Sequence, residues 1–327
     1  MAKIPLSPYS LMFAPMEGIT DEYYRNVIHE LYPQWDTYSC DFLRVPNTNP
    51  YPQKHIEKHY GNQTLKNPLL KEKTIYQILT SPGAYTAETV QSISLLGIKW
   101  LDLNLGCPSK TVCKNKGGSY LLSEIDELEK IIKIIRENFA GTFSCKIRVG
   151  YKDDQNFLNI LKMLENNGVD IIKIHARTRD QLYKGVANWD YVKKAVQSVN
   201  IPVVGNGDIW STQDIERYFD YTNCHSIMLA RSALKTPWLA RLYKNQEIDS
   251  PQLRIKEIIN YFTRFYQETH KQQNLVESSR IKRLKSVSRY IFEELPNSAQ
   301  IKKEFLLSKS FSEQIERLQQ AQQLISS

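Results

Sequence analysis

A cysteine at position 107 stands where the sequence predicts the end of a β-strand. The apolar and polar residues of Trp100–Asn104 alternate as in a strand, and Gly106 and Pro108 then interrupt the pattern. We therefore expect Cys107 at the start of a loop, where a thiol is accessible and a rigid strand positions it. A thiol with an ordinary pKa near 8.5 is mostly protonated at neutral pH, so it could donate a proton to a carbon atom.

Two other interpretations of Cys107 remain open at this point. A nucleophilic cysteine needs an activating base nearby, and the sequence shows no such pairing. A cysteine without chemistry is usually a small buried hydrophobic residue. The neighbouring residues favour a functional site, because Asn104 offers an amide donor and acceptor and Gly117-Gly118 allow the backbone to approach a ligand closely.

The elements that must position these residues alternate between short apolar runs and longer amphipathic ones. The predicted strands are Ser10–Ala14, Thr37–Leu43, Thr74–Leu79, Lys99–Asn104, Phe143–Val149, Asp170–His175, Ile201–Gly205 and Ser226–Ala230. The predicted helices between them are Asp21–Leu31, Ala84–Leu96, Glu124–Asn138, Gln155–Asn167, Trp189–Ser198 and Thr212–Tyr221. Eight such units predict an α/β fold, a (β/α)₈ TIM barrel. An open doubly wound sheet is the alternative, but Ala14-Pro-Met-Glu-Gly18 replaces the glycine motif of that fold.

Polar residues stand at every predicted strand end, which is where barrels place their active sites. In chain order these are Pro15 and Met16, Asp41 and Arg44, Gln77, Asn104 with Cys107, Lys146 with Arg148, His175 with Arg177, Asn206-Gly207-Asp208, and Ala230-Arg231. Barrels often bind phosphate after their last two strands, so the Gly-rich turn at 206–208 and Arg231 predict an anion site. An ordinary strand-to-helix turn is the alternative for that segment.

A phosphate site together with Gln77, Lys146 and His175 fits a planar phosphorylated cofactor, flavin mononucleotide (FMN). Gln77 could pair with the imide edge of the flavin, and Lys146 could neutralise charge near its N1 atom. Taken singly, Lys146 could be a strand-end lysine in solvent and His175 a core histidine, so the prediction rests on their joint placement.

The last part of the chain has only helical periodicity, in Leu253–Thr269, Val276–Glu294 and Ser310–Ile325. We therefore expect a catalytic barrel domain at residues 1–244 and a helical domain at residues 245–327. Residues 251–327 hold 13 Lys/Arg against 8 Asp/Glu, and five of these cations lie close together at Arg280, Lys282, Arg283, Lys285 and Arg289. They could contact a polyanion or form a solvated helix face, whereas Tyr261, Phe262 and Phe265 are expected in the core.

The composition excludes several classes of protein. The net charge is +8, no apolar run is long enough to cross a bilayer, and prolines interrupt the N-terminal segment where a signal peptide would be apolar. We expect a cytoplasmic monomer that has no membrane contact. Five cysteines without a C-x-x-C spacing predict neither a disulfide framework nor a metal site.

Six motifs resemble the tRNA-dihydrouridine synthases in order and spacing. They are Ala14-Pro-Met-Glu-Gly18, Leu103-Asn-Leu-Gly-Cys-Pro-Ser-Lys-Thr-Val112 with Gly117-Gly118, Lys146-Ile-Arg148, His175-Ala-Arg-Thr178, Asn206-Gly-Asp208 and Ala230-Arg231. Three motifs are most similar to the bacterial DusC class, which modifies a D-loop uridine, usually position 16: Asp41-Phe-Leu-Arg-Val45, Cys107-Pro-Ser-Lys-Thr-Val112 and Asn206-Gly-Asp-Ile-Trp210. Ala176 and Ala230 replace glycines of the pattern, and Asp41 and Asp208 replace glutamates.

The resemblance implies an FMN enzyme that uses NADPH to reduce the C5–C6 double bond of a uridine in tRNA, with a hydride from FMN to C6 and a proton from Cys107 to C5. The flavin site would contain Ala14, Pro15, Met16, Gln77, Lys146, His175, Asn206, Gly207, Asp208, Ala230 and Arg231. The flipped uracil would meet Asn104, Arg148, Arg177 and Tyr183, and the tRNA D-loop and elbow would meet Arg44, Arg280, Lys282, Arg283, Lys285 and Arg289. An FMN barrel dehydrogenase of free pyrimidines or small enones is the alternative, and an RNA-binding protein without catalysis is a second one.

Overall fold

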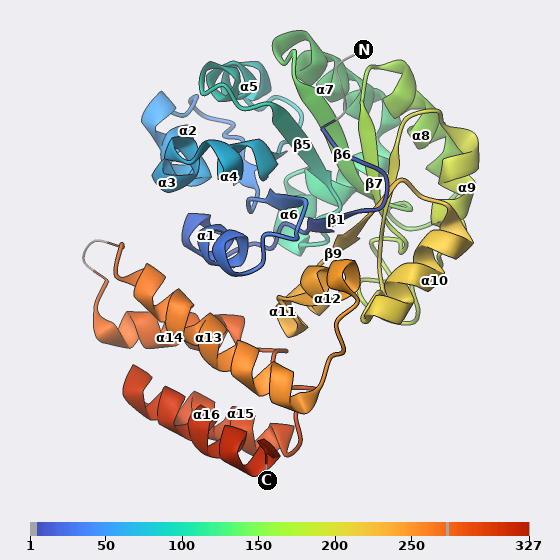
Figure 1. Ribbon diagram of the computed structural model, residues 1–327. Coiled ribbons are helices and arrows are strands. Elements are labelled where there is room, and N and C mark those ends of the chain that lie inside the picture. The colour runs from blue at the N-terminus through green and yellow to red at the C-terminus, as the bar shows by residue number, and fades with distance from the viewer. Residues whose placement is uncertain (1–4, 273–274, 327) are drawn as a thin grey trace. The chain divides into compact units, whose positions relative to one another are not determined.

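A closed parallel barrel forms the larger part of the protein in the computed structural model, which describes residues 5–272 and 275–326 (Figure 1). Strand β1 pairs with β2 and β9, β2 pairs with β4, and the remaining strands follow in chain order to β9, so the ring closes. The strands are β1 Ser10–Phe13, β2 Thr37–Ser39, β3 Leu43–Arg44, β4 Thr74–Leu79, β5 Trp100–Leu105, β6 Thr142–Arg148, β7 Ile171–His175, β8 Val203–Asn206 and β9 Ser226–Leu229. This topology confirms the predicted TIM barrel.

The second strand differs from its prediction as one continuous run over Thr37–Leu43, because the chain leaves the sheet between Ser39 and Leu43. Ser39 lies opposite Ile75 and Leu43 lies opposite Ile78, so four steps along one strand match three along the other. This extra residue is a β-bulge, which bends the strand and changes the direction of the side chains that follow it.

The six predicted helices between strands are confirmed within about two residues at their ends. The helices of this part are α1 Glu22–Leu31, α2 Gln53–Tyr60, α3 Asn62–Lys66, α4 Pro68–Lys73, α5 Thr86–Leu95, α6 Lys110–Lys114, η1 Gly118–Ser123, α7 Ile125–Asn138, α8 Phe157–Asn166, α9 Asp190–Ser198 and α10 Thr212–Thr222. Five further helices, α2, α3, α4, α6 and η1, were not predicted; they are short, and all except α6 begin at or next to a proline or glycine.

The strand register brings the polar residues of neighbouring strands to the same level. Gln77 lies opposite Asp102, which lies opposite Ser144. One level nearer the strand ends, Lys146 lies opposite both Asn104 and Lys173. The last level holds Arg148, His175 and Asn206. The barrel register therefore fixes which of the predicted site residues are neighbours.

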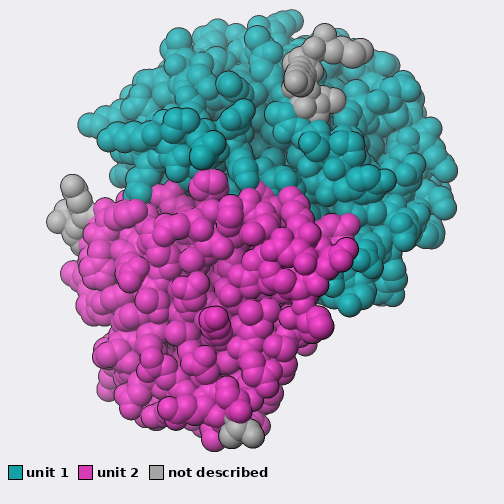
Figure 2. Space-filling model, viewed as in Figure 1, with its two compact units in different colours: residues 1–22, 36–229 teal, residues 23–35, 230–327 magenta. Residues whose placement is uncertain are grey.

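The chain forms two compact units, unit 1 with Met1–Glu22 and Asp36–Leu229, and unit 2 with Tyr23–Trp35 and Ala230–Ser327 (Figure 2). The helices after the barrel are α11 Arg231–Lys235, α12 Leu239–Asn245, α13 Pro251–Thr269, α14 Glu277–Val287, α15 Ser298–Leu307 and α16 Phe311–Ser326. The predicted division at residues 244 and 245 stays a prediction. Residues 1–4, 273–274 and 327 of the predicted domains lie outside the described residues, and so does the start of the N-terminal segment.

Unit 2 has a core of buried aromatic rings, as expected from its helical spacing. The Phe262 ring lies 4.5 Å from that of Phe305 and 6.1 Å from that of Phe292, measured between centroids. The predicted helix over Val276–Glu294 is wrong in its second half, since α14 ends at Val287. There the Ser288 hydroxyl donates to the Lys285 carbonyl at 2.8 Å and satisfies the helix end. None of the described helices is both long and apolar enough to cross a bilayer.

Candidate active site

Cys107 lies two residues beyond the end of β5 and is partly exposed, whereas the other four cysteines are buried, and all five are free thiols. Its carbonyl accepts hydrogen bonds from the Ser119 hydroxyl (2.8 Å) and the Ser119 N–H (3.3 Å). Burial raises the pKa of the Cys107 thiol, and Glu17 raises it further, so the group is protonated at neutral pH. This state suits a proton donor and not a nucleophile.

The two glycines after Cys107 are needed for close approach of the backbone. Gly118 has φ +58°, and a Cβ atom there would lie 3.1 Å from the Cys107 carbonyl oxygen. A Cβ atom on Gly117 would lie 2.9 Å from the Thr80 carbonyl oxygen. The close partner shown here is the protein's own backbone, and the expected close approach to a ligand stays a prediction.

A chain of side-chain hydrogen bonds leads from Cys107 into the barrel. The Asn104 Oδ1 atom accepts from the N–H groups of Gly106 and Cys107, each at 3.0 Å. Asn104 Nδ2 donates to Gln77 Oε1 at 2.8 Å, and Gln77 Nε2 donates to Asp102 Oδ2 at 2.6 Å. We call Gln77, Asp102, Asn104 and Cys107 the β5 side of the barrel mouth.

This series of hydrogen bonds ends at a buried ion pair that was not predicted from the sequence. The Lys173 ammonium lies 2.8 Å from Asp102 Oδ1, and both side chains are 0% exposed. The Ser144 hydroxyl donates to the same oxygen at 2.6 Å and accepts from Trp100 Nε1 at 2.8 Å. The sequence does offer a signal for this pair, because a charged residue stands between two apolar ones in each of two predicted strands: Leu-Asp-Leu in β5 and Ile-Lys-Ile in β7.

Lys146 lies on β6, between the residues of β5 and β7, and is partly exposed. Burial lowers the pKa of its ammonium to about 8, with a further contribution from the nearby Arg148 charge. At neutral pH the side chain is therefore mostly a cation that is easily neutralised. Such a group can bind an anion that develops during a reaction.

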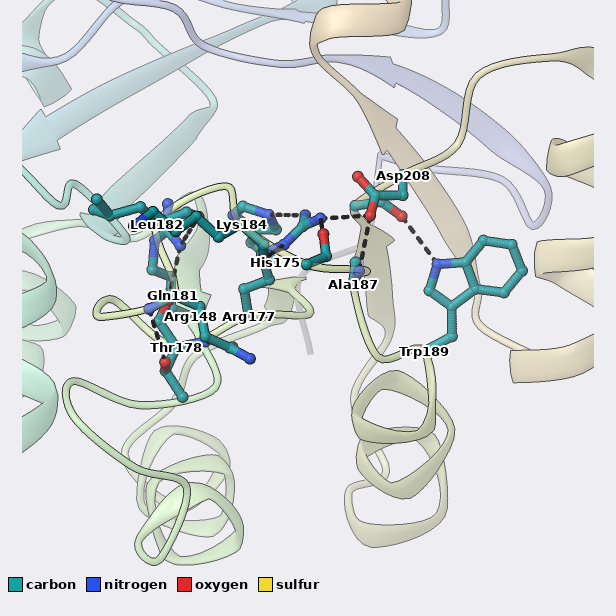
Figure 3. A network of polar contacts seen from close by, with 12 residues as sticks. Arg148, His175, Arg177, Thr178, Gln181, Leu182, Lys184, Ala187, Trp189 and Asp208 are labelled. Carbon is teal, nitrogen blue, oxygen red and sulfur yellow. Dashed lines mark hydrogen bonds and ion pairs between the residues drawn. The ribbon is translucent and has the colours of Figure 1, made fainter.

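A second network of polar contacts, which we call the β7 side, contains His175, Arg177, Asp208 and the loop at residues 178–188 (Figure 3). The Arg177 Nη2 atom lies 2.5 Å from Asp208 Oδ2, and Nη1 lies 3.3 Å from His175 Nε2. Because a guanidinium can only donate, His175 Nε2 must accept, and a neutral ring then carries its proton on Nδ1. The Asp208 carboxylate also accepts from the Ala187 N–H at 2.8 Å.

The loop of the β7 side holds two arginines by its backbone carbonyls (Figure 3). Arg148 donates to the carbonyls of Thr178 (3.0 Å) and Leu182 (2.9 Å), and its Nε donates to that of Gly106 (2.9 Å). Its guanidinium carbon also lies 5.5 Å from the centroid of the Tyr183 ring, which is 57% exposed. Arg148 thus connects the Cys107 loop with the exposed aromatic residue.

The turn after β8 has two residues with positive φ, which fits both the predicted anion site and an ordinary strand-to-helix turn, so the anion site stays a prediction. Gly207 has φ +127° and Asp208 has φ +51°, and the Gly207 carbonyl accepts from Trp189 Nε1 at 3.0 Å. Ser211 and Asp214 then form a capping box at the start of α10. The Asp208 carboxylate is directed into the β7 side, so it is Arg177 that neutralises it.

Other predicted flavin-site residues lie at the ends of β1 and β9. Ala14 is buried and its N–H donates to the Leu229 carbonyl at 2.9 Å, whereas Pro15 and Met16 are partly exposed. Ala230 and Arg231 follow β9 directly and belong to unit 2. The expected pairing of Arg231 with the turn at 206–208 therefore stays a prediction.

The five cations predicted to contact tRNA differ in their surroundings within unit 2. Arg280 donates to the Thr269 hydroxyl (3.4 Å), Lys285 donates to the Ser308 carbonyl (2.7 Å), and the Arg283 guanidinium carbon lies 5.7 Å from the Phe265 ring centroid. All three are only partly exposed, and Lys282 and Arg289 are exposed. In unit 1, Arg44 is exposed after β3. Of the five cations that were predicted to contact tRNA, two are therefore exposed to solvent.

The structure brings together a protonated thiol, two oriented amides and a titratable lysine at the ends of three neighbouring strands. This combination can bind a planar ligand with carbonyl groups and protonate it. No group of three or more His, Cys, Asp and Glu side chains in the described residues could hold a metal ion. The roles predicted for individual residues remain predictions.

The chain is similar to known proteins over almost its full length. Residues 12–326 match the family model described as dihydrouridine synthase (Dus). The chain is 32% identical to the tRNA-dihydrouridine synthase B of Pasteurella multocida over 291 residues, which are 88% of this chain and 85% of that protein. It is 31% identical to the tRNA-dihydrouridine(16) synthase of Neisseria meningitidis serogroup B over 253 residues, 76% of this chain and 74% of that protein.

Solved structures share the fold at low sequence identity. A morphinone reductase in complex with tetrahydroNAD superposes with a TM-score of 0.52 at 8% identity, covering 75% of this chain and 89% of that one. A variant of NCR from Zymomonas mobilis has a TM-score of 0.51 at 10% identity and covers 73% and 87% of the two chains. These similarities support the barrel fold independently of the sequence motifs.

Proposed function

The chain belongs to the dihydrouridine synthase family, and from this premise we propose that it reduces a uridine of tRNA to dihydrouridine, with FMN as cofactor and NADPH as reductant. The observation that carries the proposal is the half-buried, protonated Cys107 thiol beside the oriented amides of Asn104 and Gln77. A proton donor next to groups that can bind an imide is what reduction of a uracil ring requires.

The residues at the barrel mouth fit a flavin mononucleotide. Gln77 is fully buried, its oxygen accepts from Asn104 and one of its N–H groups donates to Asp102, so only its second N–H could meet the imide edge of the ring. Lys146 is a cation without an ion-pair partner among the residues that the structure describes. The backbone of the turn at Gly207 is buried and has a conformation that glycine favours, shortly before α10 (Thr212–Thr222), and we propose that this turn lies against the flavin phosphate. His175, Asn206 and Asp208 complete the predicted site with Ala14, Pro15 and Met16 from the first strand and Ala230 and Arg231 after the last.

The reaction adds two hydrogen atoms across the C5–C6 double bond of uracil. A flavin held by these residues and reduced by NADPH would supply the hydride to C6. In this proposal Asn104 holds the uracil by its amide, and Arg148, Arg177 and Tyr183 contact the same base. Cys107 gives its thiol proton to C5, so one hydride and one proton are consumed and the resulting thiolate regains a proton from water.

The raised pKa of Cys107 supports this role, because the thiol keeps its proton at the pH where the enzyme works. A base within a folded tRNA must be extruded to enter such a pocket. We propose that Lys282 of α14 and Arg289, two residues beyond that helix, contribute most to the phosphate contacts of unit 2. Arg44 of unit 1 would contribute as well and, more weakly, Arg280, Arg283 and Lys285. Neutralising Lys282 and Arg289 should lower the salt slope of tRNA binding by about 2, the number of phosphate contacts removed.

The test is an assay with purified protein, FMN, NADPH and unmodified tRNA transcripts. We expect NADPH oxidation that depends on tRNA, and dihydrouridine in the product by mass spectrometry at a single D-loop uridine, which we propose is position 16. A protein that binds no flavin, or that forms no dihydrouridine with any transcript, would overturn the proposal. We further propose that the protein acts as a monomer in the cytoplasm, where tRNA is modified.

Free uridine and a small enone serve as competing substrates in the same assay. Turnover of either at a rate above that of tRNA would support the alternative function, a flavin dehydrogenase of small molecules. Salt-sensitive tRNA binding without any flavin would support an RNA-binding protein that lacks catalysis.

A further inference from the structure

The buried pair Asp102 and Lys173 has no part in the proposed reaction, although it lies directly below the groups that do. Both side chains are 0% exposed, and they reach each other across β6, the strand that lies between theirs. A buried ion pair adds little stability compared with apolar residues of similar size. Its position therefore calls for a different explanation.

The hydrogen bonds that connect the pair to Cys107 have a fixed direction. The N–H groups of Gly106 and Cys107 can only donate, so the Asn104 atom that meets them is its oxygen. The Asn104 amino group must then face Gln77, whose oxygen accepts from it at 2.8 Å. This leaves the Gln77 amino group to donate to Asp102.

The contacts of Asp102, at the other end of this series of hydrogen bonds, require the same direction of donation. Asp102 Oδ1 receives the Lys173 ammonium and the Ser144 hydroxyl, and Oδ2 receives the Gln77 amino group at 2.6 Å. A carboxylate with three donors around it accepts only, so Gln77 cannot turn its oxygen toward it. The two ends require the same orientation of both amides.

We propose that Asp102 is a positioning residue, which, held as a carboxylate by Lys173 and Ser144, fixes the orientation of the Gln77 and Asn104 amides and through them the Cys107 loop. Asn104 then presents a second N–H, a donor suited to a uracil carbonyl. The catalytic consequence rests on the proposed function, whereas the orientation itself can be tested in flavin-free protein without tRNA.

Asp102→Asn is the decisive variant. An asparagine has only one acceptor oxygen. If that oxygen accepts from Gln77, the amino group faces the Lys173 ammonium, and two donors then meet. The variant must therefore lose either the contact with Lys173 or the fixed orientation of the Gln77 and Asn104 amides. We expect the amide N–H groups of Gly106 and Cys107 to exchange with deuterium roughly 5-fold faster, the effect of losing one ordinary hydrogen bond.

Lys173→Met is the matched control. It removes the cation but leaves a carboxylate that still only accepts, so we expect lower thermal stability and amide exchange at Gly106 and Cys107 within about 2-fold of wild type. In the double variant Asp102→Asn/Lys173→Met, the asparagine can present its oxygen to Gln77 and its amino group to Ser144. We expect the double variant to regain slow exchange.

Gln77→Met keeps the ion pair and removes the connection, so it tests the proposal even if Asp102→Asn fails to fold. It should speed exchange as Asp102→Asn does, and the alkylation rate of Cys107 by iodoacetamide, followed by peptide mass spectrometry, should change in both variants. Unchanged exchange in Gln77→Met, or faster exchange in Lys173→Met than in Asp102→Asn, would overturn the proposal. An enzyme inactive on tRNA but with these exchange differences would overturn only the proposed function.

Discussion

The β5 side and the β7 side of the barrel mouth hold their polar groups by different kinds of contact. On the β5 side the partners are side chains of the barrel strands, from the buried Asp102 and Lys173 up to Asn104, and only Cys107 belongs to a loop. On the β7 side, Arg177 donates to the carbonyls of Lys184 and Gly185 in a loop that also carries the exposed Tyr183.

The difference suggests a division of tasks. Barrel register fixes the β5 side, so its groups keep their positions whether or not a ligand is bound. The β7 side depends on the conformation of residues 178–188, in which Leu182 and Gly185 both have positive φ. We therefore expect variants of the β5 side to lower the rate of the chemical step and variants of the β7 side to change stability or binding.

The largest effect is expected from Cys107→Ala, which removes the proton donor. Loss of a general acid lowers a rate by about 100- to 10,000-fold, and dihydrouridine formation should fall within that range. Flavin binding, followed by fluorescence quenching, should stay within about 2-fold, because the thiol is not part of the predicted flavin site. Cys113→Ala, a buried cysteine in helix α6 shortly after Cys107, is the control and should keep its activity. Wild-type turnover by Cys107→Ala would exclude the assigned role.

Asp208→Asn tests the β7 side. The Arg177 side chain is 1% exposed, so the variant leaves a buried guanidinium without its carboxylate. Removing one partner of a buried ion pair costs about 3 kcal/mol, which urea unfolding would measure. The double variant Asp208→Asn/Arg177→Met should recover part of this loss. A single variant as stable as wild type would mean that the loop carbonyls alone satisfy the guanidinium.

Lys146 lies between the two sides, and its charge depends on pH near neutrality. Its pKa of about 8 means that the ammonium is mostly charged at pH 7 and mostly neutral at pH 9. We expect FMN affinity to fall by about 10-fold over this interval, since one favourable charge interaction of roughly 1.4 kcal/mol is lost. Lys146→Met should bind FMN weakly at both pH values without this dependence.

The same lowered pKa predicts how the stability of flavin-free protein changes with pH. The unfolded chain holds the Lys146 proton up to its ordinary pKa of 10.5, whereas the folded protein releases it near 8. Between these values the unfolded state binds more protons, so stability rises with pH. Relative to Lys146→Met, the wild type should gain about 2 kcal/mol between pH 7 and 10. A constant difference would show that the folded pKa is not lowered.

The sequence predicted the strand ends well, because each apolar strand stops at a glycine, a proline or a polar residue. Gln77, Asn104, Lys146 and His175 lie on adjacent strands in the expected order. The contact between Asp102 and Lys173 could not be predicted, since it joins residues 71 positions apart and depends on which face of each strand points inward. Periodicity also could not tell which cations of α14 turn toward α13, because that depends on how the helices pack.

The smallest effect is expected at Tyr183, the most exposed aromatic residue of the β7 side. Its ring lies against Arg148, which also binds the Gly106 carbonyl of the Cys107 loop. A partly exposed cation–π contact contributes about 0.5 to 1 kcal/mol, so Tyr183→Ala should raise KM for tRNA by about 2- to 5-fold. Tyr183→Phe keeps the ring and should stay close to wild type. If Tyr183→Ala instead lowered kcat with KM unchanged, the β7 side would act on the chemical step as well, and the separation between the two sides would fail.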